Sequence, residues 1–203
     1  MRALARACLV IAACAPLAQA RDQPPPAADA ALQAIGAAPS PARIEADIRT
    51  LVSFGTRHTL SDTTSPTRGI GAARRWIRAE FERISRDCGG CLELRDVRGV
   101  VSGEERIPGP SEVVSILAIQ RGTADPGRYV IMSGDIDSRV SDVMDATSDS
   151  PGANDNASGI AGTLEAARIL SRHRFPATIV YAALSGEEQG RFGGKQVAEV
   201  AVR

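Results

Sequence analysis

The chain has 203 residues, of which 43% are hydrophobic, and its 24 basic and 24 acidic side chains give a formal net charge of zero. A balanced charge provides no global electrostatic field that would draw the chain to nucleic acid or to an anionic membrane, so we expect neither as a partner. The apolar content is that of a soluble globular domain.

The chain begins with the features of an export signal, assigned to residues 1–20. Arg2 and Arg6 form a basic start, an apolar stretch follows, and Ala18-Gln19-Ala20 is a small-x-small cleavage site. The apolar stretch is shorter than the roughly 20 residues that span a bilayer, so we predict a periplasmic or secreted protein without a transmembrane segment. A lipoprotein signal with Cys14 as the lipidated residue is the alternative.

Two helices are predicted in the first half of the chain. Residues 21–39 are rich in Ala and Pro and predict a linker or a loosely ordered arm. Ser40-Pro41 is a typical start for a helix that ends at Gly55. Apolar residues at helical spacing predict a second helix over residues 68–85.

Cys88 and Cys91 enclose a Gly-Gly pair and are the two cysteines outside the export signal. In an oxidising compartment we expect a small structural disulfide that closes this turn. A redox-active thiol pair is the alternative, and no second cysteine or histidine pair completes a zinc site around them.

The second half alternates strands and helices. In chain order we expect strands over 112–120 and 128–133, a polar loop over 137–154, a helix over 158–172, a buried strand over 177–184 and a helix over 192–202. A turn rich in Gly and Pro joins the first two strands and predicts a hairpin. The later order of strand, loop, helix and strand predicts a parallel crossover, and therefore an α/β sheet.

Acidic residues gather where these strands end. Two directly follow the strand over 128–133, two follow the strand over 177–184, and one opens the connecting helix: Asp135, Asp137, Glu187, Glu188 and Asp155. Because sites in open α/β sheets lie beyond the carboxyl ends of the strands, we expect all five carboxylates on one rim. Packed carboxylates protonate unless a cation compensates them, and only Arg139 and Arg191 are local basic partners. Divalent metal is therefore the favoured interpretation.

Each acidic residue also has a purely structural interpretation. Asp155 with Asn156 can cap the following helix, Asp137 can cap a turn, and residues 187–188 can belong to a solvated loop. Taken singly, each of these interpretations is at least as good as a metal role. Their shared position at the strand ends favours the metal.

Four segments together resemble the di-zinc aminopeptidase family that includes bacterial leucyl aminopeptidase and aminopeptidase Y. They are residues 151–159 (PGANDNASG), 185–190 (SGEEQG), 134–138 (GDIDS) and 51–57 (LVSFGTR). The resemblance covers about residues 40 to 200. It implies a three-layer αβα fold with a mixed, largely parallel central sheet, incomplete at the C-terminus.

The resemblance also implies roles and cofactors. Asp155 would bridge two metal ions, Glu188 would bind one of them, and Glu187 would be the general base for the attacking water. Asp135 stands at the family's metal-binding histidine and would be a ligand. Asp137 is assigned to the catalytic group as the residue that tunes this metal. Two divalent ions are implied: zinc in the family, with manganese, cobalt or magnesium also suited to an all-oxygen site.

The family has a further acidic ligand and a histidine downstream of the segment that matches residues 185–190. This chain ends at Arg203, so we expect residues 40–203 to be the N-terminal portion of a metallopeptidase domain with little activity by itself. Its only histidines, His58 and His173, are expected to be packing or surface residues.

The function that these expectations favour is an exported metallo-aminopeptidase, which hydrolyses N-terminal peptide bonds of peptide or protein substrates through metal-activated water. Another hydrolase of the same fold is one alternative, either a carboxypeptidase or a glutaminyl-cyclase-like enzyme. A catalytically inactive peptide-binding fragment is the other.

Overall fold

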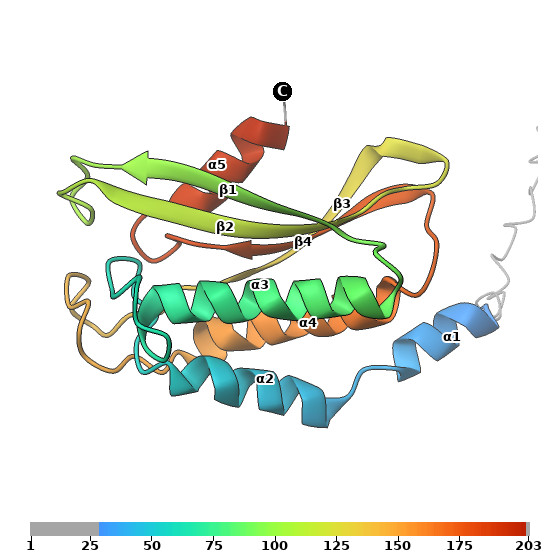
Figure 1. The fold of residues 1–203 in the computed structure, drawn as a ribbon, viewed down its shortest axis with the longest axis horizontal. Helices are drawn as coiled ribbons and strands as arrows, with labels where there is room; N and C mark the ends of the chain where they lie inside the picture. The colour runs from blue at the N-terminus through green and yellow to red at the C-terminus, as the bar shows by residue number, and fades with distance from the viewer. Residues whose placement is uncertain (1–28, 202–203) are drawn as a thin grey trace, which may run out of the picture.

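The computed structural model describes residues 29–201. The predicted export signal, Cys14 included, and the first part of the predicted linker lie outside this range. Within it, four strands form one mixed sheet in the order β1-β2-β4-β3 (Figure 1). Their bounds are β1 (Glu93–Val101), β2 (Ser111–Gln120), β3 (Asp125–Asp135) and β4 (Ala177–Leu184).

The strand pairing confirms the predicted crossover and corrects the predicted hairpin. β3 and β4 pair in parallel, whereas β2 pairs antiparallel with both β1 and β4. The hairpin between β2 and β3 is therefore wrong, because β4 lies between these two strands. β2 is buried along nearly its whole length, so it needs a partner on each side, and β1 supplies the second one. We expected a largely parallel sheet, and among the described strands the parallel pair is β3 with β4.

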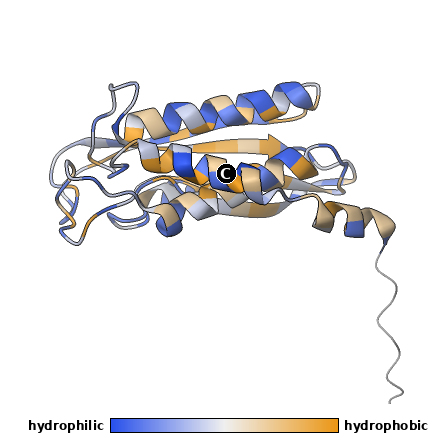
Figure 2. Cartoon of the chain, turned by 90° about the horizontal axis from the view of Figure 1, so that it is seen from below, coloured by the Kyte–Doolittle hydropathy of each residue, from blue (hydrophilic) through white to orange (hydrophobic). Residues whose placement is uncertain are grey.

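Helices cover both faces of the sheet (Figure 1), as the predicted three-layer αβα architecture requires. One layer holds α3 (Gly69–Asp87) and α4 (Ser158–Leu170), with α2 (Pro41–Ser53) packed outside α4. The other face carries α5 (Phe192–Ala201), which contacts β1 and β2. Figure 2 shows apolar colour along strands of the sheet and a mixture of apolar and polar colour on the helices, as expected for elements buried on one side.

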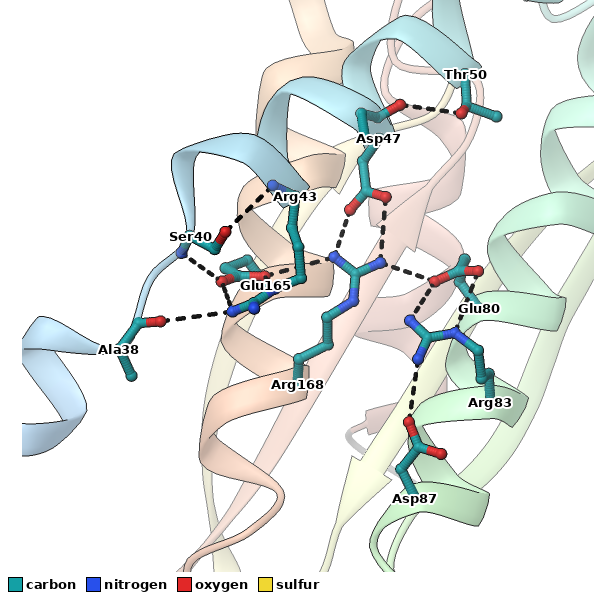
Figure 3. A network of polar contacts seen from close by, with 11 residues as sticks. Ala38, Ser40, Arg43, Asp47, Thr50, Glu80, Arg83, Asp87, Glu165 and Arg168 are labelled. Carbon is teal, nitrogen blue, oxygen red and sulfur yellow. Dashed lines mark hydrogen bonds and ion pairs between the residues drawn. The ribbon is translucent and has the colours of Figure 1, made fainter.

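A buried ion network joins the helices of the first layer (Figure 3). Arg168 of α4 contacts Asp47 of α2 at 2.5 Å and Glu80 of α3 at 2.8 Å. Arg43 binds the buried Glu165 at 2.5 Å, which ties the start of α2 to α4. Such networks contribute little net stability but fix how elements sit against one another. Here they fix the three helices that support the β3–β4 crossover.

Two elements of the structure were not predicted. β1 is charge-rich and has one buried residue, and α1 (Ala30–Ala37) is a short helix without buried residues inside the predicted linker. The predicted disulfide between Cys88 and Cys91 is confirmed, and it lies between α3 and β1. Within residues 29–201, no helix combines the length and the apolarity that crossing a lipid bilayer requires.

Candidate metal centre at the sheet edge

The five predicted acidic residues come from three segments that end at one edge of the sheet. The parallel register pairs Asp135 at the end of β3 with Leu184 at the end of β4, so residues 187 and 188 follow at the same edge. Asp155 lies in the segment Ala153–Ala157, where its own backbone is not helical (φ −114°, ψ 97°), directly before α4 leaves this edge. The predicted convergence at the strand ends is therefore present in the fold.

Asp135 shows that the five carboxylates are close enough to interact. Burial is the largest cause that raises the pKa of Asp135, and with it four neighbouring negative charges bring that pKa to about 6: Asp137, Glu187, Asp155 and Glu188. Burial also raises the pKa of Glu188, to which Asp155 and Asp137 contribute, while Arg139 lowers it. The edge therefore carries negative charge that the protein's own cations compensate only in part.

Asp137 is buried, with 1% of its surface exposed, and its carboxylate organises the loop after β4. The backbone N–H of Glu187 donates to Oδ1 at 3.2 Å, and that of Glu188 donates to Oδ2 at 3.0 Å. The Thr59 hydroxyl donates to Oδ2 at 2.8 Å. With both oxygens already bound, Asp137 positions the two glutamates rather than facing solvent.

The two glutamates point toward different cations. Glu188 Oε2 accepts a 2.7 Å bond from Nε of Arg139, and Glu187 lies 3.4 Å from Nε of Arg191. These arginines are the two that the sequence offered as local partners. The Glu187 side chain is 39% exposed, whereas that of Glu188 is 14% exposed. Glu187 is thus the more exposed of the two glutamates.

Arg57 fastens the acidic edge to the end of α2. It is 1% exposed, and its guanidinium donates at 2.8 to 3.1 Å to four backbone carbonyls, those of Ile136, Leu51, Pro151 and Gly152. Burial lowers its pKa to about 10, while the charge of Asp137 acts in the opposite direction. Sequence reasoning gave this residue no role, because carbonyl partners leave no residue-type pattern to detect.

Close backbone approach at this edge requires glycine at two positions. A Cβ on Gly134 would lie 2.4 Å from the backbone of Gly159, where the end of β3 meets the start of α4. Gly152 has a φ of 46°, and a Cβ there would lie 2.5 Å from Cβ of Ser138. Both glycines therefore let the β3 exit, the loop and α4 approach one another closely.

The two histidines are not grouped with the carboxylates. His58 is buried, and its Nε2 lies 2.9 Å from Nε2 of Gln189 and 3.0 Å from the Val143 carbonyl. His173 follows α4, and its carbonyl accepts a bond from Gln120 Nε2 at 2.7 Å. His58 thus packs in the interior and His173 is exposed, which agrees with the predicted packing or surface positions. Sequence reasoning assigned no role to Thr59, which donates to Asp137, or to Gln189, which contacts His58.

The donor set fits divalent cations by charge and chemistry. Asp135, Asp155 and Glu188 supply carboxylate oxygens, and burial together with the neighbouring negative charges raises the pKa of Asp135. Across residues 29–201, however, no three His, Cys, Asp or Glu side chains already stand close enough together to hold a metal ion. Binding would therefore require side-chain movement, above all release of Glu188 from Arg139.

Comparison with known sequences points to metallopeptidases. The family described as Peptidase family M28 matches residues 115–202. A probable zinc metalloprotease of Leptosphaeria maculans is 49% identical over 173 residues, which is 85% of this chain and 40% of that protein. One from Pyricularia oryzae is 49% identical over 172 residues, which is 84% of this chain and 34% of that protein. The chain thus spans at most 40% of the length of these two relatives.

Comparison with solved structures confirms the predicted α/β fold. The Legionella pneumophila LapA aminopeptidase matches with a TM-score of 0.62 at 19% identity, over 83% of this chain and 40% of that one. Porphyromonas gingivalis glutaminyl cyclase matches with a TM-score of 0.58 at 20% identity, over 77% of this chain and 51% of that one. At these identities the likeness concerns the fold.

Proposed function

We propose that this chain is part of an exported zinc metallopeptidase of family M28, an aminopeptidase that hydrolyses N-terminal peptide bonds. One observation carries the proposal: carboxylates from three segments meet at one edge of the sheet, where burial and four neighbouring negative charges raise the pKa of Asp135. Structural residues of a stable fold seldom concentrate like charge in this way, whereas a site for divalent cations does. The similarity to probable zinc metalloproteases over 85% of the chain supports the same function.

In this proposal Asp135, Asp155 and Glu188 hold two divalent ions, with zinc as the first choice. When bound, the ions would lower the pKa of a water molecule and polarise the scissile carbonyl. Glu187 accepts the proton of the attacking water and returns it to the leaving amine as the C–N bond breaks. Asp137 keeps Glu187 and Glu188 in place through their backbone N–H groups.

The test combines metal binding with turnover in the protein that contains this chain. Zinc content is measured for the wild type, Asp155→Asn and Glu187→Gln, with hydrolysis of a peptide carrying a free amino end. We expect Asp155→Asn to lose zinc and activity, and Glu187→Gln to keep zinc but lose turnover. The matched control Glu45→Gln, on the exposed face of α2, should keep both. Full turnover in Glu187→Gln would contradict its role as the general base.

Blocked substrates separate the related activities. An aminopeptidase needs the free amino end, so acetylation of that end should stop hydrolysis while amidation of the C-terminus should not. A carboxypeptidase would show the reverse, and a glutaminyl-cyclase-like enzyme would release ammonia from peptides that begin with Gln. Peptide binding without any of these reactions would identify an inactive fragment.

A further inference from the structure

A basic pocket lies behind the acidic edge, between α3 and the β1–β2 pair. Its volume is about 530 Å³. Four arginines and two carboxylates line it: Arg74, Arg75, Arg78, Arg98, Asp96 and Glu112. The charged lining is therefore dominated by cations, unlike the edge where the five carboxylates meet.

Both carboxylates of the pocket are already paired. Asp96 contacts Arg78 and Arg98, the latter at 2.7 Å, and Glu112 lies 3.4 Å from Arg98. Arg75 donates to the carbonyls of Thr63 and Ser65 instead of to a carboxylate. Within residues 29–201, no acidic side chain is left in the lining to pair with the remaining guanidinium groups.

Arg74 is the arginine of this pocket whose guanidinium has a buried N–H without a hydrogen-bond acceptor among the described residues. It is 9% exposed, and its hydrogen bonds within residues 29–201 come from Nη2, which donates to Ser185 Oγ at 3.0 Å and to the Glu112 carbonyl at 3.4 Å. Its Nε is buried without a partner in this part of the chain. A buried guanidinium N–H without an acceptor is unfavourable, so an acceptor bound in this pocket would stabilise Arg74.

We propose that this pocket binds an oxyanion, a carboxylate or phosphate group, against Arg74 and Arg75. Planar guanidinium groups recognise both anions through charge-assisted hydrogen bonds. The pocket adjoins the acidic edge at two points, because Arg74 donates to Ser185 and the lining residue Thr59 donates to Asp137. The proposal goes beyond peptidase activity, and binding can be measured without metal or turnover.

The test is isothermal titration calorimetry of the full chain with inorganic phosphate, at constant ionic strength against sodium chloride. We expect one phosphate per chain in the wild type and a Kd at least about tenfold weaker in Arg74→Gln, because charge-assisted hydrogen bonds are lost. Arg75 lies at the exposed side of the pocket, and we expect Arg75→Gln to weaken binding about two- to fivefold. This second variant keeps the test usable if Arg74→Gln does not fold. The control Arg49→Gln removes the same charge from the exposed face of α2 and should bind as the wild type does.

Two further titrants distinguish the sources of the anion. An acetylated dipeptide with a free C-terminal carboxylate tests a peptide as the ligand, and its C-terminal amide is the matched control. Binding of the acid but not of the amide assigns the pocket to a peptide carboxylate, and binding of phosphate alone assigns it to a phosphate group. The proposal is overturned if neither anion gives heat beyond chloride, or if Arg75→Gln and folded Arg74→Gln bind as the wild type does.

Discussion

The carboxylate of Asp137 accepts a hydrogen bond from the backbone N–H of Glu188 at 3.0 Å, across 51 positions of sequence. Glu187 N–H binds the other oxygen, and Thr59 completes the set. One buried carboxylate thus joins the exit of β3 to the loop after β4. The two glutamates that we propose for metal binding and proton transfer depend on this contact for their positions.

Asp137→Asn should therefore destabilise the protein and disturb the glutamates together. An amide keeps one acceptor oxygen but places an NH2 group near a backbone N–H, so we expect a loss of about 2–3 kcal/mol in the free energy of unfolding. Urea denaturation measures it. The control is Asp142→Asn, whose carboxylate accepts a bond from Met144 N in an exposed loop, with an expected effect below about 1 kcal/mol. Equal effects of the two substitutions would contradict the role of Asp137.

Arg57→Met should be among the most destabilising substitutions in the chain. It removes a donor from four carbonyls, of which those of Leu51 and Gly152 keep a backbone N–H, from Phe54 and Ala157. The carbonyls of Ile136 and Pro151 lose the Arg57 donor, and because each buried acceptor left unpaired costs roughly 1–3 kcal/mol, we expect a loss of at least about 2 kcal/mol. Arg57→Lys keeps the charge but cannot reach all four carbonyls. Its free energy of unfolding should therefore lie between those of the wild type and Arg57→Met. Thermal and urea unfolding check this order. Arg68→Met, which removes a partly exposed pair with Asp149, should cost less than about 1 kcal/mol.

Asp135 predicts a specific pH dependence of stability. Its folded-state pKa is about 6 against an ordinary value of 3.8. Between these values the folded chain holds a proton that the unfolded chain has released, so the free energy of unfolding falls as the pH rises. The penalty is absent below pH 3.8 and complete above about pH 6.

Asp135→Asn should remove this penalty. We expect the variant to be more stable than the wild type at pH 7 by about 1–2 kcal/mol, allowing for partial exposure, and equally stable at pH 3.5. Unfolding measured at a series of pH values without divalent ions tests the sign. Asp145→Asn is the opposite control, since local hydrogen bonds from Ser148 and Thr147 lower the pKa of that exposed carboxyl, and its loss should destabilise at pH 7. A stability difference between Asp135→Asn and the wild type that does not grow from pH 3.5 to pH 7 would refute the assignment.

Local signals were sufficient for much of this fold. Ser40 does accept the N–H of Arg43 as the predicted cap of α2, and the apolar run Ala177–Leu184 is a strand buried along most of its length. The position of Asp155 and the two glutamates at the sheet edge was predictable because the acidic motifs directly follow predicted elements. These features depend on residues that are neighbours in the sequence, so a single sequence is enough to predict them.

Features that depend on distant partners were not predictable in the same way. β1 has one buried residue, Val97, so it lacks the alternation that identifies a half-buried strand. The order of β2, β4 and β3 is decided by competition among strands for partners, which a Gly-Pro turn between β2 and β3 does not reveal. Arg57 binds carbonyls up to 95 positions away, and a carbonyl carries no side-chain signature.

β3 predicts self-association of the chain. It pairs with β4 on one side and is the terminal strand of the described sheet, and its apolar side chains Tyr129, Val130, Ile131 and Met132 are 39–53% exposed. An exposed apolar edge strand is a template for pairing with another chain, so we expect concentration-dependent oligomers in sedimentation velocity. Ile131→Lys places a charge on this edge and should shift the chain toward monomer.

The control substitution is Val100→Lys, on the charge-rich strand β1 at the opposite edge of the sheet. It should leave the distribution of oligomers unchanged, because Glu93, Arg95 and Arg98 already protect that edge. A wild-type chain that stays monomeric at every concentration would show that the apolar surface of β3 does not mediate pairing.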